Sequence, residues 1–515
     1  MFSVLISFAI ALVGTLAFVP LAKRIAVKVK LVDIPDNKRK LHSTPIPLVG
    51  GISAFLVAFL AIVTCFLIAF STGEITQLEE GDILQLWGLF AAALLLLVVG
   101  IVDDRFGMRG RQKLVGQIVV ATLLIMFGYS FDSVEFFGFK LQLGHFALLV
   151  MYAWILGGIN SVNLLDGADG FATSLGILMS AGLCVMSLFN GHFLDGIIAA
   201  AMCGALIGFL RYNFPPATAY LGDSGSMVIG LMVAALAIRS ASKQPTAYAF
   251  FAPMALLAIP MLDTLAAIIR RRLTGKSIYS TDRGHIHHEL MRRGLSPKLA
   301  LLWFSLLCAT TVVGATLSLI YKQSEYAVVS IVAVTIFLVA GRVFGFAEFK
   351  LVSRKAMSLS RSFFVLNKRD KVNAPDDESI IQLQGNRNWD FAWQTIKEFV
   401  EKHEISELTM DLEFPWLGEN FHATVRSNIK NGEEMEANDW FSEIPIEYQD
   451  RLAGRILVKA NTDRCSAYQT IPLLIDVLDS LQSDLKKVIE LQSQLDSSEI
   501  LELDNSEDKT AVSNA

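Results

Sequence analysis

The chain has 515 residues, of which 53% are hydrophobic and 18% are charged, and its mean hydropathy is +0.49. That composition excludes an ordinary soluble domain and predicts an integral membrane protein surrounded by a lipid bilayer. The formal net charge is −5, but acidic residues concentrate near the C-terminal end, so the membrane portion is basic. We expect its basic loops to face anionic lipid or an anionic substrate, and we expect no nucleic-acid partner.

Apolar stretches close to the length that crosses a bilayer recur through the first two thirds of the chain. They predict an all-α polytopic membrane domain with about eleven transmembrane helices. The first stretch has neither a basic segment before it nor a small-residue cleavage site after it, so we interpret it as a retained helix and not as a signal peptide. The expected spans are residues 2–21, 48–70, 83–102, 114–127, 143–158, 171–189, 193–210, 225–238, 249–269, 299–320 and 327–344.

The distribution of lysine and arginine predicts the orientation of these spans. Basic clusters follow the first, third and ninth spans, whereas the alternate connections carry at most one or two basic residues. Because basic loops stay in the cytoplasm, the N-terminus is expected outside. An odd number of helices then places the C-terminal segment in the cytoplasm.

The carboxylate pair Asp103 and Asp104 ends the third span in the sequence VGIVDD. Adjacent carboxylates repel one another and are costly near hydrocarbon, so the pair predicts a bound cation or proton. Mg²⁺ prefers oxygen ligands and accepts one or two carboxylates together with substrate phosphate. The alternative is a structural pair that Arg105 and Arg109 neutralise.

A second polar group follows the fifth span in the sequence NSVNLLDGADG. Asn160 and Asn163 share a helix face, so both amides can point to one place. Asp166 and Asp169 follow in two Asp-Gly steps that end the helix. These groups have no basic residue nearby and favour a binding site, the alternative being a polar helix end with Asx turns.

Two later loops carry groups that suit a phosphate or a metal ion. Asp223 precedes the eighth span between a glycine and a serine, where it is either a helix N-cap or part of a metal and phosphate site. The loop after the ninth span lacks the partners usual for zinc, so we interpret its basic residues as donors to a phosphate or nucleotide. These residues are Arg283, His285, His287 and His288.

The orientation predicted from lysine and arginine places all of these loops in the cytoplasm, together with a basic loop at residues 33–51. The pattern therefore predicts one cytoplasm-facing site for a metal ion and a phosphorylated substrate. A polytopic transporter and a membrane-anchored sensor are the alternatives. A transporter would carry its polar groups near the bilayer midplane.

Taken together, these loops resemble the polyprenyl-phosphate N-acetylhexosamine-1-phosphate transferases, the glycosyltransferase family 4 that includes the WecA, TagO and MraY types. The resemblance spans roughly residues 1–345. The HIHH form is more similar to the WecA branch than to the MraY branch, which implies UDP-GlcNAc as the donor. The matching strings are RKLHSTPIPLVGG at 39–51, VGIVDD at 99–104, NSVNLLDGADG at 160–170, YLGDSGS at 220–226 and DRGHIHH at 282–288.

The resemblance implies an enzyme of the bacterial inner membrane that transfers GlcNAc-1-phosphate, or a related HexNAc-1-phosphate, from the UDP-sugar to undecaprenyl phosphate and releases UMP. The product would enter a cell-envelope polysaccharide pathway, and a homodimer is left open. The implied cofactor is Mg²⁺ or Mn²⁺, with Asp104 and Asp223 as metal ligands. The implied catalytic residues are Asp103, Asp104, Asp166 and Asp169, and the implied substrate-binding residues are Lys113, Asn160, Asn163, Arg283, His285, His287 and His288.

The resemblance does not cover the C-terminal third of the chain. Residues 346–387 predict a basic linker at the membrane surface, residues 388–495 a small cytoplasmic α+β domain and residues 496–515 a disordered acidic tail. Within that domain, NWDFAWQTIKEFVEKH predicts a helix, SELTMDLEF, FHATVRSNI and GRILVKAN predict strands, and residues 471–495 predict a long helix. Because no catalytic constellation occurs there, we expect its removal to leave activity largely intact.

Overall fold

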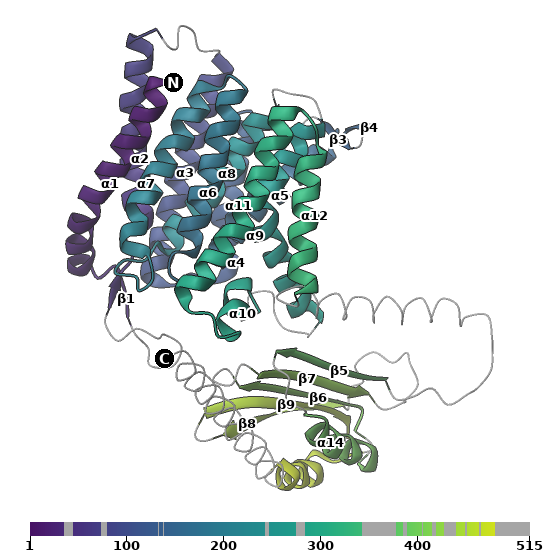
Figure 1. Cartoon of the computed structure of the whole chain (residues 1–515). Coiled ribbons are helices and arrows are strands. Elements are labelled where there is room, and N and C mark those ends of the chain that lie inside the picture. Colours follow the sequence, from purple (N-terminus) through teal and green to yellow (C-terminus); the bar gives the residue numbers. More distant parts are fainter. Residues whose placement is uncertain are drawn as a thin grey trace, which may run out of the picture. The chain divides into compact units, whose positions relative to one another are not determined.

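The structure is a computed structural model of the whole chain (Figure 1). The chain divides into two compact units, Met1–Phe349 and Lys350–Ala515, which are considered separately. The described residues are 1–34, 45–73, 80–131, 133–136, 139–242, 247–273, 284–341, 377–384, 389–403, 405–414, 419–426, 439–448, 451–462 and 465–478.

The first unit is a helical bundle (Figure 1). Among its described residues, nine helices are long and apolar enough to cross a membrane, which confirms the predicted helical membrane domain. The helices are α1 (Phe2–Val29), α2 (Gly50–Ser71), α3 (Glu80–Phe106), α4 (Gly110–Met126), α5 (Phe146–Leu165), α6 (Phe171–Phe189), α7 (Phe193–Asn213), α8 (Gly222–Ser242), α9 (Ala247–Leu273), α10 (Ile286–Arg292), α11 (Pro297–Tyr321) and α12 (Glu325–Ala340). Two short antiparallel strand pairs connect helices, β1 (Val32–Asp33) with β2 (Ile46–Pro47) and β3 (Ser133–Phe136) with β4 (Phe139–Gln142).

Among the described residues, fewer helices are long enough to cross a membrane than the eleven predicted spans. The fourth and eleventh predicted spans correspond to α4, with 17 residues, and α12, with 16 residues. At 1.5 Å per residue these helices are ~26 Å and ~24 Å long, shorter than a hydrocarbon core of about 30 Å. The count of eleven therefore stays a prediction.

Polar residues that mark the predicted site lie on helix ends. Helix α3 continues through Asp103 and Asp104 to Phe106, and α5 continues through Asn163 to Leu165. A regular helix fixes the direction in which each Cα–Cβ bond points. The neighbours Asp103 and Asp104 therefore project in different directions from α3.

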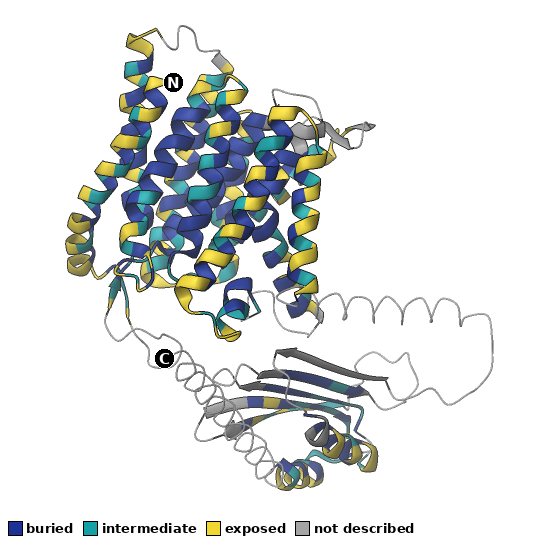
Figure 2. Ribbon diagram, in the orientation of Figure 1, coloured by how far each residue is buried: buried dark blue, intermediate teal, exposed yellow. Residues whose placement is uncertain are grey.

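Helix α8 is enclosed along nearly its whole apolar length, and α2, α3, α5, α6 and α9 pack around it (Figure 2). Glycines allow this close packing. A Cβ on Gly51 of α2 would lie 2.3 Å from the Gly225 nitrogen, and a Cβ on Gly100 of α3 would lie 2.3 Å from the Ser224 Cα atom. Backbone contacts of this kind hold the N-terminus of α8 against α2 and α3.

The other end of α8 carries a buried ion pair. Arg239 donates to Asp195 of α7 over 2.7 Å. It also donates to Gln85 over 2.6 Å and to Asp82 over 3.2 Å, both on the first turns of α3. A buried ion pair is tolerated when hydrogen bonds compensate for its lost hydration. This cluster joins α3, α7 and α8 at the end of the bundle opposite to Asp103.

The second unit is a five-stranded antiparallel sheet with helices on one face (Figure 1). The strand order is β5-β7-β6-β9-β8, with β5 (Asp377–Gln384), β6 (Glu407–Phe414), β7 (Glu419–Arg426), β8 (Asp439–Tyr448) and β9 (Arg451–Asn461). Helix α14 (Asp390–Lys402) and the helix Ala467–Leu478 share an apolar core with the sheet. Trp393 of α14 and Leu474 of the last helix are buried in this core.

These elements confirm a C-terminal α+β region with the predicted helix at α14 and the predicted strands at β6, β7 and β9. Strands β5 and β8 were not predicted, and β5 lies within the segment interpreted as a linker. The predicted helix at 471–495 begins earlier, at Ala467, and its continuation beyond Leu478 lies outside the described residues. The proposed tail at 496–515 also lies outside them, and the domain boundaries stay predictions.

Candidate active site

Side chains from α3, α4, α5 and α8 meet around one ammonium group. Lys113 Nζ lies 2.9 Å from Asp103 Oδ2 and 3.0 Å from Asp223 Oδ1. It also donates to Asn163 Oδ1 over 3.0 Å. The Asn163 amide nitrogen in turn donates to Asp223 and, over 2.9 Å, to Ser226 Oγ. We call Asp103, Lys113, Asn163 and Asp223 the lysine cluster.

Asp104 binds the N-terminus of α8. Its Oδ1 accepts the backbone N–H of Asp223 over 2.7 Å, and its Oδ2 accepts that of Ser224 over 3.2 Å. The preceding Gly222 has a φ of +77°, and a Cβ there would lie 2.7 Å from Asp104 Oδ2. The partial positive charge of a helix N-terminus stabilises such a carboxylate. Both Asp104 oxygens are therefore engaged, and its predicted role as a metal ligand stays a prediction.

Asn160 and Asp169 connect neighbouring segments. Asn160 exchanges two amide hydrogen bonds with Gln117 of α4, of 2.7 Å and 3.2 Å. The two amides have different partners, because Asn160 pairs with Gln117 whereas Asn163 contacts Lys113, Asp223 and Ser226. Asp169 Oδ2 accepts the backbone N–H of Ala217 over 2.8 Å. Substrate contacts of Asn160 and a catalytic role of Asp169 stay predictions.

Asp166 ends α5 and is half-buried beside the lysine cluster. Burial and the negative charges of Asp223 and Asp104 raise the pKa of Asp166 well above its ordinary value. The next residue touches the histidine segment, since a Cβ on Gly167 would lie 3.0 Å from His287 Nε2. The structure therefore brings the histidines to the end of α5.

Helix α10 and its N-cap carry the histidines. His287 is buried, and neither of its ring nitrogens has a hydrogen-bond partner within the described parts of the chain. Burial and the neighbouring His288 and His285 lower the pKa of His287 well below its ordinary value, so its ring is neutral at pH 7. Buried polar atoms without partners cost free energy, so His287 is available to a ligand group.

Asp263 of α9 contacts His285, although it belongs to none of the predicted site loops. His285 Nδ1 lies 2.7 Å from Asp263 Oδ2, and the backbone N–H of Ile286 donates to Asp263 Oδ1 over 3.1 Å. Asp263 is fully buried. A carboxylate at Nδ1 favours a proton on that nitrogen and fixes the orientation of the ring. A lone acidic residue inside a predicted span was the signal that could have revealed it.

Other predicted site segments are described only in part. Arg283 and residues 35–44 of the first loop lie outside the described residues. The end of that loop is described, and the backbone N–H groups of Val49 and Gly50 donate to the Tyr220 carbonyl over 3.2 Å and 3.0 Å. The first loop therefore contacts the segment that leads into α8.

The family model and the similar proteins that match this chain point to the same family. Residues 86–241 match the family described as glycosyl transferase family 4. Over 304 residues the chain is 32% identical to the "probable undecaprenyl-phosphate N-acetylglucosaminyl 1-phosphate transferase" of Bacillus subtilis (strain 168), an alignment that covers 59% of this chain and 81% of that relative. The chain belongs to glycosyl transferase family 4.

Further relatives of this chain are also named as polyprenyl-phosphate N-acetylglucosamine phosphate transferases. It is 30% identical over 325 residues to the "decaprenyl-phosphate N-acetylglucosaminephosphotransferase" of Mycobacterium tuberculosis (strain ATCC 25618 / H37Rv), covering 58% of this chain and 79% of that one. It is 30% identical over 345 residues to the "undecaprenyl-phosphate alpha-N-acetylglucosaminyl 1-phosphate transferase" of Salmonella typhi, covering 64% and 87%. The chain is therefore an enzyme of the transferase class, and the transporter and sensor alternatives are set aside.

The lysine cluster of this family 4 enzyme suits a hard divalent cation. Within the described residues, no group of three or more His, Cys, Asp or Glu side chains could hold a metal ion by itself. Mg²⁺ needs only one or two protein carboxylates, because water and substrate phosphate complete its octahedron. Oxygens of Asp103, Asn163 and Asp223 already converge on one cation, the ammonium of Lys113. These oxygen atoms are of the kind that a hard divalent cation prefers, and a metal ion at this site stays a prediction.

Proposed function

We propose that this enzyme transfers GlcNAc-1-phosphate, or a related HexNAc-1-phosphate, from a UDP-sugar to undecaprenyl phosphate. The lysine cluster carries this proposal, because it places a fixed cation and hard oxygen ligands at the end of apolar helices. The names of the relatives, which specify undecaprenyl or decaprenyl phosphate and N-acetylglucosamine, support the same reaction.

The reaction joins two anions, so the protein must neutralise charge and align the reactants. An oxygen of the lipid phosphate forms a bond to the sugar-bearing phosphorus of the UDP-sugar. The bond from that phosphorus to the bridging oxygen breaks, and UMP leaves with that oxygen. The products are undecaprenyl-diphosphate-sugar and UMP.

We assign the acceptor to the lysine cluster. Lys113 would hold the lipid phosphate through its ammonium group, which already lies among oxygen ligands. Asp103 would orient that phosphate and accept its proton when it arrives protonated. Its position is fixed by the backbone N–H of Met108, which donates to Asp103 Oδ1 over 2.7 Å.

We assign the donor to the end of α5 and the histidine segment. Asn163, Asp166 and Asp169 would contact the nucleotide or a metal ion. The donor diphosphate and sugar would be held by His285, His287, His288 and Arg283. The unpaired ring nitrogens of His287 within the described residues support this assignment.

Mg²⁺ or Mn²⁺ is the proposed cofactor, with Asp223 and Asp104 as its protein ligands. Such an ion would neutralise charge on the diphosphate and on the departing UMP. The lysine and arginine distribution supports a site on the cytoplasmic face of the inner membrane, where UDP-sugars are available.

Release of UMP by the purified full chain tests the proposal. The reaction contains UDP-GlcNAc, undecaprenyl phosphate and Mg²⁺, with controls that omit the acceptor or replace Mg²⁺ with a chelator. We expect UMP only in the complete reaction, and Asp223→Asn to lower turnover on the order of 10²-fold or more. Asp476→Asn, an exposed carboxylate of the second unit, is the matched control. Absence of UMP with folded protein, or acceptor-independent release, would reject the proposal.

A further inference from the structure

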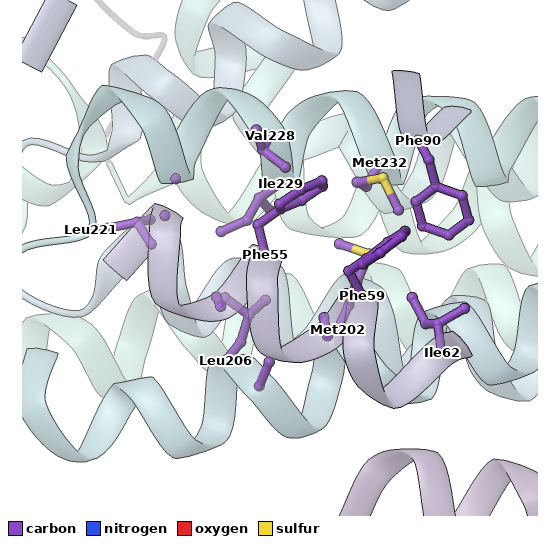
Figure 3. Close-up of a pocket in the computed structure, with 15 residues that line it drawn as sticks. Phe55, Phe59, Ile62, Phe90, Met202, Leu206, Leu221, Val228, Ile229 and Met232 are labelled. Atoms are coloured by element: carbon purple, nitrogen blue, oxygen red, sulfur yellow. The ribbon is translucent and has the colours of Figure 1, made fainter. Parts of the chain in front are cut away.

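An apolar crevice lies along α2, where residues of α7 and α8 and Phe90 of α3 complete its lining (Figure 3). Helices α2 and α3 both pack against α8, and α2 also packs against α7. Ala54 and Ala58 of α2 form one wall, Phe90 of α3 forms another, and Leu206 and Ile229 lie at its base. The small side chains of α2 leave room for a slender apolar group.

The length of the crevice matches one leaflet of a bilayer. It runs from Gly51 to Ile62 along α2, a rise of ~16 Å. The rings of Phe59 and Phe90 meet edge to face with centroids 5.2 Å apart near its inner end. Half of a hydrocarbon core is about 15 Å. One acyl chain of a leaflet lipid therefore fits this length, whereas a polyprenyl tail is much longer.

An exposed guanidinium group lies at the end of α3, on the side of the bundle where the crevice begins. Arg105 is exposed on the last turn of α3 and donates to the carbonyl of Val29 at the end of α1. It lies about one and a half turns beyond Gly100, which packs on Ser224, and the crevice begins at Gly51, which packs on the neighbouring Gly225. Its other recorded contact among the described residues is with the Phe106 ring. Its charge is thus available to an anionic group at the bilayer surface.

The crevice is separated from the lysine cluster by backbone contacts. Gly51 packs on Gly225, and Gly100 packs on Ser224, each too closely to admit a Cβ atom. A lipid chain in the crevice therefore presents its phosphate to Arg105 rather than to Lys113. This geometry points to a bilayer lipid as the occupant and not to the acceptor.

We propose that this crevice binds one acyl chain of an anionic phospholipid whose phosphate pairs with Arg105. The bound chain packs along α2, one of the two helices that hold the N-terminus of α8. Lipid at this site supports the helix end that carries Asp223, without entering the reaction. The site is independent of the donor and acceptor assigned above.

Native mass spectrometry of the detergent-solubilised full chain tests this site. Delipidated protein is titrated separately with phosphatidylglycerol, phosphatidylcholine and undecaprenyl phosphate, and the one-lipid adduct is measured. Phosphatidylglycerol is expected to bind the wild type about five-fold more tightly than phosphatidylcholine. Arg105→Gln should abolish that preference. Arg272→Gln, an exposed arginine at the end of α9, is the matched control and should retain it.

Filling the crevice distinguishes this site from other lipid contacts. Ala58→Phe should weaken both phospholipid adducts, whereas Leu60→Phe, on the exposed face of the same helix, should not. If Ala58→Phe does not fold, Ala54→Leu replaces it. Unchanged adducts in the folded filling variant, or a retained preference in Arg105→Gln, would overturn the proposal. Displacement of phosphatidylglycerol by undecaprenyl phosphate would also overturn it and assign the crevice to the acceptor.

Discussion

Lys113 allows two carboxylates from separate helices to lie together where the bundle is only partly exposed. Asp103 and Asp223 would otherwise repel each other, and each would lose hydration without compensation. A single ammonium within 3.0 Å of both removes that cost. The lysine therefore stabilises the fold around the site as well as supplying its positive charge.

Replacing Lys113 tests both contributions. We expect Lys113→Gln to lower UMP release on the order of 10²-fold or more and also to lower the unfolding midpoint, because two carboxylates lose their cationic partner. Activity and thermal unfolding of the solubilised protein measure the two effects. Lys298→Gln changes an exposed lysine at the start of α11 and should alter neither. Normal turnover in Lys113→Gln would exclude a role in holding substrate.

Asp263 is predicted to act on turnover through His285, which it contacts. If Asp263 acts by orienting His285, Asp263→Asn should lower turnover about 10-fold to 100-fold and mainly affect the response to donor concentration. The double variant with His285→Asn should then be no worse than His285→Asn alone. Additive losses in that cycle would show that the two residues act separately.

Residue types and spacing could predict much of the site. Asp103, Asn163 and Asp223 were identified from carboxylates and amides next to apolar spans, and the structure brings them together with Lys113. The pairing of Asn160 with Gln117, and of Asp263 with His285, depends on how helices pack. Sequence spacing contains no information about contacts between segments so far apart.

At the scale of elements, the approach of α2 and α3 to α8 depends on glycines. A methyl group at Gly51 would meet backbone atoms of Gly225 and cannot be relieved by rotating a side chain. The length of the apolar stretches predicts that the helices α3 and α5 exist. It does not predict where they end, because polar residues of the site continue both helices. Helix packing at the glycines was likewise not visible in the hydropathy pattern.

Gly51→Ala should therefore destabilise the bundle. Overpacking of this kind typically costs about 1–3 kcal/mol, and the resulting displacement of α8 should also lower UMP release. Thermal unfolding in detergent measures the first effect. Gly81→Ala is the matched control, since nothing lies within 4 Å of a Cβ at that helical position. A midpoint in Gly51→Ala equal to that of Gly81→Ala would contradict the close contact.

At the scale of the whole molecule, the second unit has an apolar core of its own. Its helix and three of its strands could be predicted from periodicity, whereas β5 and β8 were missed. In β5 and β8 the acidic, amide and proline residues weaken the alternation of apolar and polar side chains. Only the pairing of β5 with β7 therefore shows that β5 belongs to the sheet of the second unit.

Removal of the second unit tests its contribution to turnover. A chain that ends at Lys371 lacks all five described strands of the sheet. We expect it to keep UMP release within about two-fold of the full chain, because every described residue of the lysine cluster remains. Its folding is checked by thermal unfolding. Loss of turnover in a well-folded truncated chain would assign the second unit a part in the reaction.

The two attachments between α3 and α8 have a mechanical consequence. Asp104 holds the first residues of α8, and Arg239 ties the other end of α8 to Asp82 and Gln85. These points are ~24 Å apart along α8. A helix pair fastened at both ends can neither slide nor rotate as two rigid rods. We therefore expect the spacing between Asp103 and Asp223 to change little during turnover, and we expect an opening for the proposed nucleotide donor to involve other helices, such as α9 and α10.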